Sequence, residues 1–132
     1  MRVAGWKAVT DGSNQGFTGR QRQPYYTRDT LGLYYIEPAD LRAMAIERGR
    51  QGWPLSLHGN GDAAIDLFIA AVRAAKEKYP EVDNRPVLIH GQTLREDQVG
   101  QLEELGIFPS LFPMHTFYWG DWHRDSVLGP ER

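Results

Sequence analysis

The order of apolar and polar residues divides the chain into short strand-like runs and longer segments with helical periodicity. An uninterrupted apolar run predicts a buried strand, whereas apolar residues three and four positions apart predict a helix packed on one side. The predicted strands are residues 3–10, 55–58, 87–90 and 107–112. Their alternation with helices predicts right-handed βαβ units and a parallel sheet. Because the later strands are almost uniformly apolar, we expect both faces of the sheet to be covered.

Three helices are predicted between these strands. Pro38 begins the first helix, which ends near Gly49. Asp62 is expected to cap the second helix, whose apolar stripe faces the sheet. Thr93 and Glu96 have the spacing of a capping box at the start of the third. The fold class is therefore α/β, with one helix crossing over between successive strands.

Two segments between the predicted strands and helices differ from ordinary connecting loops in their length or their aromatic content. Residues 14–35 form a long loop after the first strand, and the pair Tyr25 and Tyr26 indicates that this loop is packed. Residues 115–123 are interpreted as an aromatic loop, which either packs against the sheet or lines a pocket. We expect both segments to shape the specificity of any site nearby.

Length, charge and cysteine content exclude several classes of protein. A chain of 132 residues suits one domain, here residues 1–132. The net charge of −2 predicts no nucleic-acid or membrane partner. The chain has no cysteine, which excludes disulfides and thiolate chemistry and fits a reducing, cytoplasmic location. No apolar run approaches the roughly 18 residues of a membrane span, and no signal peptide or dinucleotide-binding motif is recognisable.

Two predicted strands end on a histidine that is followed by glycine. These are His58 and His90, and 32 residues separate them, about the length of one strand–helix unit. Parallel strands present their carboxyl ends at one edge of the sheet, so both imidazoles are expected to face one site. A single histidine at such a position is more often structural, but the matching pair makes a shared metal or catalytic site equally plausible.

Lys7 lies near the end of the first predicted strand and allows several interpretations. It can be a lysine at a sheet edge that extends its amine into water. It can also act as a base, as a Schiff-base amine in a carbonyl enzyme, or as a metal-bridging carboxylate after reaction with CO2. Its position in the sequence does not separate these roles.

Several spaced motifs together resemble amidohydrolase family 3, a branch of the metal-dependent amidohydrolases that includes N-substituted formamide deformylase-like proteins. The resemblance covers nearly the whole chain. Its motifs are Lys7-x-x-x-Asp11-Gly12-Ser13, Pro24-Tyr25, His58-x-x-Gly61-Asp62-x-Ala64, His90-Gly91-Gln92, Leu105-Gly106-Ile107, His115-Thr116-x-x-Trp119-Gly120-Asp121 and Leu128-Gly129-Pro130-Glu131-Arg132.

The resemblance implies a partial TIM-type (β/α)8 barrel, about strands four to seven, with a metal centre at the carboxyl ends of its strands. Lys7 matches the lysine that is carboxylated to bridge two metals, and His58 and His90 match two histidine ligands. The implied reaction is hydrolysis of C–N, amide-type bonds in small molecules by water activated at one or two divalent ions, with zinc expected. The implied substrate-binding residues are Tyr25, Asp62, Gln92, His115, Trp119 and Asp121.

The chain also departs from the family pattern. It has no His-x-His pair of the kind carried by the family's first strand, and the eighth-strand aspartate would lie beyond Arg132. We therefore expect an incomplete catalytic domain that is inactive alone and self-associates through its sheet edges. The alternatives are a non-catalytic βα domain that acts through assembly or binding, and the Schiff-base enzyme.

Overall fold

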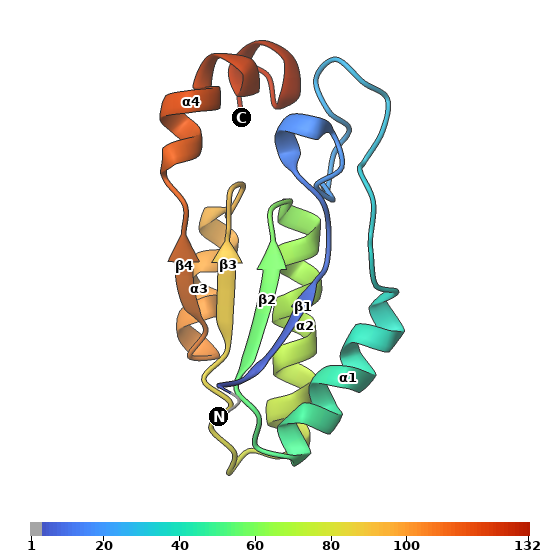
Figure 1. Cartoon of the computed structure of the whole chain (residues 1–132), viewed down its shortest axis with the longest axis vertical. Coiled ribbons are helices and arrows are strands. Elements are labelled where there is room, and N and C mark those ends of the chain that lie inside the picture. The colour runs from blue at the N-terminus through green and yellow to red at the C-terminus, as the bar shows by residue number, and fades with distance from the viewer. Residues whose placement is uncertain (1–3) are drawn as a thin grey trace.

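Four parallel strands form one sheet in which each strand pairs with the next one along the chain (Figure 1). The strands are β1 (Trp6–Val9), β2 (Leu55–Gly59), β3 (Val87–His90) and β4 (Phe108–Leu111). The computed structural model describes residues 4–132, so Val3, the expected start of the first strand, lies outside the described residues. The parallel order confirms the predicted α/β architecture.

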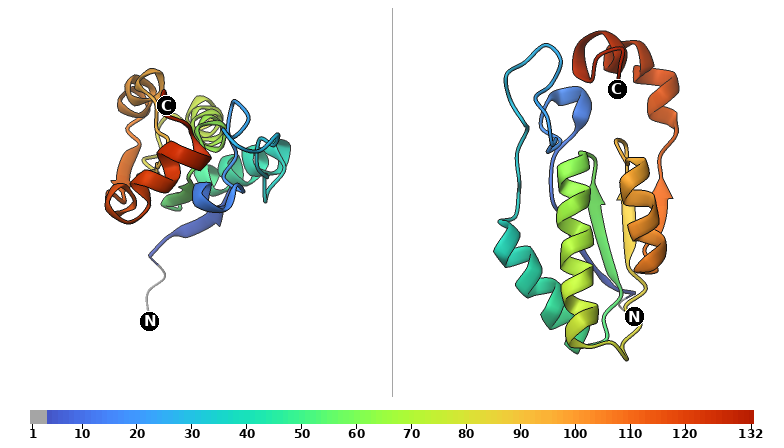
Figure 2. Two further views of the ribbon diagram at one scale, coloured as in Figure 1. Left: turned by 90° about the horizontal axis from the view of Figure 1, so that it is seen from above. Right: turned by 180° about the vertical axis from the view of Figure 1, so that it is seen from behind.

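Three helices connect the strands and lie on the same side of the sheet (Figure 2). They are α1 (Pro38–Arg50), α2 (Asp62–Lys78) and α3 (Glu96–Glu104). The core between helices and sheet includes Leu57, Phe68 and Leu88, all fully buried. Burial of each such side chain stabilises the fold by roughly 1.5–3 kcal/mol before conformational entropy is counted. The predicted helices are therefore confirmed, together with the packing of α2 on the strands.

No helix within residues 4–132 covers the other face of the sheet, so the prediction of two covered faces is wrong. The strand register places Lys7 beside Ser56 and Val9 beside His58, opposite the buried residues of these strands. Phe108 in β4 exposes 68% of its surface. The apolar strand sequences therefore reflect a sheet with one face packed by helices and another face left open in this chain.

We expect the open face to drive self-association, because it combines exposed apolar side chains with unpaired strand edges. Sedimentation velocity should show concentration-dependent association of the wild-type chain. Phe108→Lys should weaken that association by about tenfold or more, since a charge would be desolvated in the contact. Val99→Lys, which alters an exposed residue of α3, serves as the control. A wild-type chain that stays monomeric throughout would contradict this expectation.

The starts of α2 and α3 differ from the predicted caps. Gly61, not Asp62, is the N-cap of α2, and the Asp62 carboxylate accepts a hydrogen bond from the Arg22 backbone N–H at 2.7 Å. At α3 the N-cap is Arg95, whose backbone N–H donates to the Gln98 side chain at 3.1 Å. Both expected caps are engaged by residues distant in sequence: Asp62 accepts from Arg22, and the Thr93 hydroxyl donates to the Asn60 carbonyl oxygen at 2.8 Å.

Residues 115–123 were expected to form a loop, and that expectation is wrong. Met114–Trp122 forms helix α4, and a π-helical turn, His123–Val127, follows it. None of the α4 residues is buried, and Phe117 exposes 81% of its surface. A short 3-10 turn, Asn14–Gly16, begins the long loop after β1. Within the described residues, no helix is both long and apolar enough to cross a membrane.

Candidate metal centre and adjoining cavity

His58 and His90 lie together at the carboxyl end of the sheet. His58 is the fourth residue of β2, and His90 is the last residue of β3. Their ring centroids are 4.8 Å apart, with the rings nearly perpendicular. The structure therefore brings the two imidazoles to one site, as the sequence analysis expected.

An unusual backbone conformation at His90 accompanies this approach. Side chains alternate between the faces of a strand, so His90 would point toward the helices together with the buried Leu88. His90 instead has a left-handed φ of 77°, which breaks the alternation at the strand end. Such a conformation is uncommon for a residue other than glycine and is found preferentially at functional sites.

The His58 ring is oriented by the turn that follows β1. Its Nε2 atom lies 3.2 Å from the Gly12 carbonyl oxygen and 3.5 Å from Oδ1 of Asp11. The Asn60 side-chain nitrogen lies 3.1 Å from the same atom. A metal-binding histidine commonly has its second nitrogen held by a carbonyl or carboxylate oxygen in this way. These contacts all involve Nε2 of His58, and none of them involves Nδ1.

Asp11 is the central residue of this turn and is completely buried. Its carboxylate accepts hydrogen bonds from the backbone N–H groups of Arg20 at 2.9 Å, Asn60 at 3.0 Å and Gly61 at 2.8 Å. Burial raises the pKa of Asp11, and these three donors partly oppose the shift. The sequence suggested only a turn residue here. The structure shows a carboxylate that ties the loop after β1 to the turn after β2.

Lys7 lies on the open face of the sheet, on the same face as His58, and its side chain is exposed.

Burial lowers the pKa of His90, and the charges of His58, Lys7 and His115 lower it further. His90 therefore favours the neutral form, which is the form that binds a metal.

The residues of this centre fit part of a metal site. His58 and His90 offer two imidazoles, and Lys7 offers an amine on the same face of the sheet. Among residues 4–132, however, no group of three or more His, Cys, Asp and Glu side chains is arranged to hold a metal ion. Structural and catalytic zinc sites use three or four protein ligands, so these groups alone do not complete a coordination shell.

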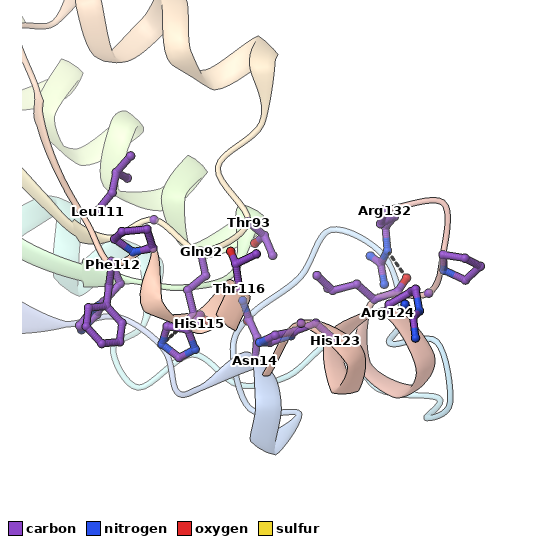
Figure 3. Close-up of a pocket in the computed structure, with 17 residues that line it drawn as sticks. Asn14, Gln92, Thr93, Leu111, Phe112, His115, Thr116, His123, Arg124 and Arg132 are labelled. Carbon is purple, nitrogen blue, oxygen red and sulfur yellow. Dashed lines mark hydrogen bonds between the residues drawn. The ribbon is translucent and has the colours of Figure 1, made fainter. Parts of the chain in front are cut away.

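A cavity of about 430 Å³ adjoins His90 at the same end of the sheet (Figure 3). Residues that follow β3 and β4 form one side of the cavity, and helix α4 and the C-terminal residues form the other. Gln92 and His115, both predicted as substrate-binding residues, line it. The amide nitrogen of Gln92 is hydrogen-bonded to Nε2 of His115. The cavity is therefore lined both by this hydrogen-bonded pair and by His90, one of the candidate metal ligands.

The other predicted substrate-binding residues lie elsewhere. Tyr25 is 3% exposed, and its hydroxyl donates to the Gly19 carbonyl oxygen within the long loop. Burial raises the pKa of Tyr25 to about 12. Asp62 is buried at the start of α2, whereas Trp119 and Asp121 are exposed on α4. None of these four residues lines the cavity.

His123 is a cavity residue that the sequence analysis did not single out. Its ring centroid lies 6.1 Å from that of His115. Burial lowers the pKa of both imidazoles. Eight residues of a regular α-helix span about 12 Å, so the spacing of these histidines in the sequence gave no signal that their rings lie close.

Comparisons with known proteins relate this chain to one family. A family profile described as "Amidohydrolase family" matches residues 1–132. Protein LONG AFTER FAR-RED 3 from Arabidopsis thaliana is 26% identical over 136 residues, covering 100% of this chain and 23% of that protein.

Two solved structures have the same fold over nearly the whole chain. An uncharacterized metal-dependent hydrolase from Pyrococcus furiosus matches with a TM-score of 0.78 and 25% identity, covering 99% of this chain and 26% of its own. Another from Pyrococcus horikoshii OT3 matches with a TM-score of 0.83 and 24% identity, covering 98% and 25%. The chain thus spans about a quarter of the proteins it matches.

The four parallel strands and their helices form a partial TIM-barrel-like hydrolase fold with histidines at the carboxyl ends of two strands. The profile match across the whole chain shows that it belongs to the amidohydrolase family.

Proposed function

We propose that this chain contributes part of the active site of a metal-dependent hydrolase acting on C–N bonds of amide-type small molecules. The observation that carries the proposal is the approach of the His58 and His90 rings to 4.8 Å, with His90 in a left-handed conformation. Membership of the amidohydrolase family and the two metal-dependent hydrolases of like fold support it.

His58 and His90 are the proposed metal ligands, and zinc is the proposed ion. His58 would bind through Nδ1, because its Nε2 faces the Gly12 carbonyl and Asp11. Lys7, once carboxylated by CO2, would add an oxygen ligand from the same face of the sheet. A bound divalent ion supplies Lewis-acid chemistry, by acidifying water and polarising a carbonyl oxygen. The protein residues hold these groups in place and keep His90 neutral.

The substrate would lie in the cavity beside His90, with Gln92 and His115 in its wall. We place an amide such as an N-substituted formamide there, because next to His90 the cavity combines apolar side chains with the neutral hydrogen-bonding groups of Gln92 and His115. Of the other predicted contacts, Trp119 and Asp121 belong to α4, and Tyr25 and Asp62 support the long loop. These four would act only through the elements that carry them.

Metal binding tests the proposal directly. Isothermal titration of the metal-free chain with Zn²⁺ should detect binding that His58→Ala and His90→Ala each weaken by at least about tenfold, since each removes a ligand. His123→Ala should leave the affinity unchanged, because His123 lies in the cavity and outside the ligand set. Amide hydrolysis should be absent in this chain and present in a longer chain that supplies further ligands.

Three results would contradict the proposal. Zinc affinity that survives both histidine substitutions would remove the proposed ligands. A chain that binds no divalent ion would instead favour a βα domain that acts through assembly, for which the open sheet face provides the surface. Full hydrolytic activity in the present chain would refute its proposed incompleteness.

A further inference from the structure

The hydrogen-bonded pair formed by Gln92 and His115 brings together two elements at the cavity. Gln92 follows β3, two residues after His90, and His115 belongs to the first turn of α4. Figure 3 shows the Gln92 side chain directed toward the His115 ring, and both residues line the cavity. The pair is separate from the proposed metal ligands, although His90 lines the same space.

Each residue of the pair has one buried polar atom without a partner. Among residues 4–132, neither Oε1 of Gln92 nor Nδ1 of His115 finds a hydrogen-bond partner. A buried polar atom of this kind destabilises the protein unless another group satisfies it, so these atoms favour a bound polar group. Nδ1 of His123, which also lines the cavity, is buried without a partner among the same residues.

The chemistry of the pair defines what it can bind. If the Gln92 amide donates to Nε2 of His115, then Nδ1 of the neutral ring carries the proton, and Oε1 of Gln92 is free to accept. If the amide is turned over, Nδ1 accepts and the amide nitrogen donates. In both arrangements, one residue of the pair offers a hydrogen-bond donor and the other offers an acceptor. Burial lowers the pKa of His115 and so maintains the neutral ring.

We propose that Gln92 and His115 form a recognition site for a neutral group that donates one hydrogen bond and accepts another, as a primary amide does, carried on a flat apolar body. Leu111, Phe112 and Leu128 supply the apolar part of the cavity wall. A carboxylate offers only acceptors and an amidinium only donors, so each leaves one atom of the pair unsatisfied. The two arginines of the cavity wall are already engaged: Arg124 pairs with Asp121 and Asp125, and Arg132 donates to the carbonyl oxygens of Leu128 and Pro24. The inference rests on the proposed function in taking this group to be part of the substrate beside His90.

A displacement of α4 would allow a ligand to reach the two buried atoms. α4 carries His115 and contains no buried residue, so a small displacement separates few packed side chains. Ligand binding would replace the missing partners as the helix shifts.

Three ligands of almost equal shape test the inference on the present chain without metal. Benzamide, benzoate and benzamidine share a phenyl ring and differ in hydrogen-bonding groups. Titrations followed by two-dimensional NMR should give a millimolar dissociation constant for benzamide and at least about tenfold weaker binding of the other two. Equal binding of the three ligands, or no binding of benzamide, would overturn the inference.

Substitutions of Gln92 give the sharper result. Gln92→Leu keeps the shape of the side chain but removes both polar atoms, and it should abolish the preference for benzamide. Gln92→Glu supplies only acceptors, so it should reverse the preference toward benzamidine. Gln101→Leu makes the same change in α3, outside this cavity, and should have no effect. Unchanged benzamide preference in a folded Gln92→Leu or Gln92→Glu variant would overturn the proposal.

A zinc titration of the wild-type chain and of its His58→Ala and His90→Ala variants separates this inference from the proposed function. Zinc binding that depends on His58 and His90, without selectivity for benzamide, would overturn the recognition site and support the proposed metal centre. Benzamide selectivity that depends on Gln92, without any metal binding, would support the recognition site and overturn the proposed hydrolase.

Discussion

Replacement of Asp11 by alanine is expected to lower the free energy of unfolding by about 3–5 kcal/mol. The carboxylate is fully buried and accepts hydrogen bonds from the backbone N–H groups of Arg20, Asn60 and Gly61. Alanine would leave these donors without an acceptor in a site that its small side chain cannot fill. Chemical denaturation followed by circular dichroism measures the change.

The matched control for this substitution is Asp29→Ala. Asp29 is exposed in the long loop, so its replacement should leave the free energy of unfolding nearly unchanged. A comparable loss of stability in both variants would indicate a general effect of lost negative charge and would contradict the role assigned to the Asp11 hydrogen bonds.

Gly61→Ala is the second substitution with a large expected effect. A Cβ atom at Gly61 would lie 1.9 Å from the Arg20 carbonyl oxygen and 2.4 Å from the Arg20 carbonyl carbon. Both are backbone atoms, so the loop would have to move, and the hydrogen bonds of Asp11 to Arg20 and Gly61 would be disturbed with it. We expect a loss of at least about 2 kcal/mol of stability, measured by denaturant unfolding.

Gly100→Ala provides a control of opposite sign. Gly100 lies inside α3, and a Cβ atom there would meet no other atom within 4 Å. Alanine should therefore stabilise the chain by about 0.5–1 kcal/mol, because it loses less backbone freedom on folding. Equal destabilisation by the two alanine substitutions would show that the close approach at Gly61 is not what makes glycine necessary.

The sequence was sufficient for those features that arise from local patterns. The apolar runs that end at His58 and His90 identified two strands, and the crossover helices identified their parallel arrangement. Because parallel strands share one carboxyl edge, the proximity of the histidines followed from topology. The structural comparisons agree on the fold.

Features set by long-range contacts could not be read from the sequence. Asp11 resembled a turn residue, but its partners include Asn60 and Gly61, about 50 residues away. Helix α4 was missed because its apolar residues surround the helix and leave no polar face, so the usual periodicity is absent. The left-handed conformation of His90 was not predicted, because the apolar run before it indicated that the strand continues through this residue.

The conformation of His90 places two separate demands on a single position in the chain. A left-handed backbone is tolerated best by glycine and, less well, by asparagine and aspartate, whereas the proposed chemistry requires an imidazole. In a library of all amino acids at position 90, survivors chosen for folding alone would thus be enriched in those small residues. Survivors chosen for activity in a longer chain would retain histidine. The difference between the two sets of survivors would show how much folding stability is lost by keeping an imidazole at position 90.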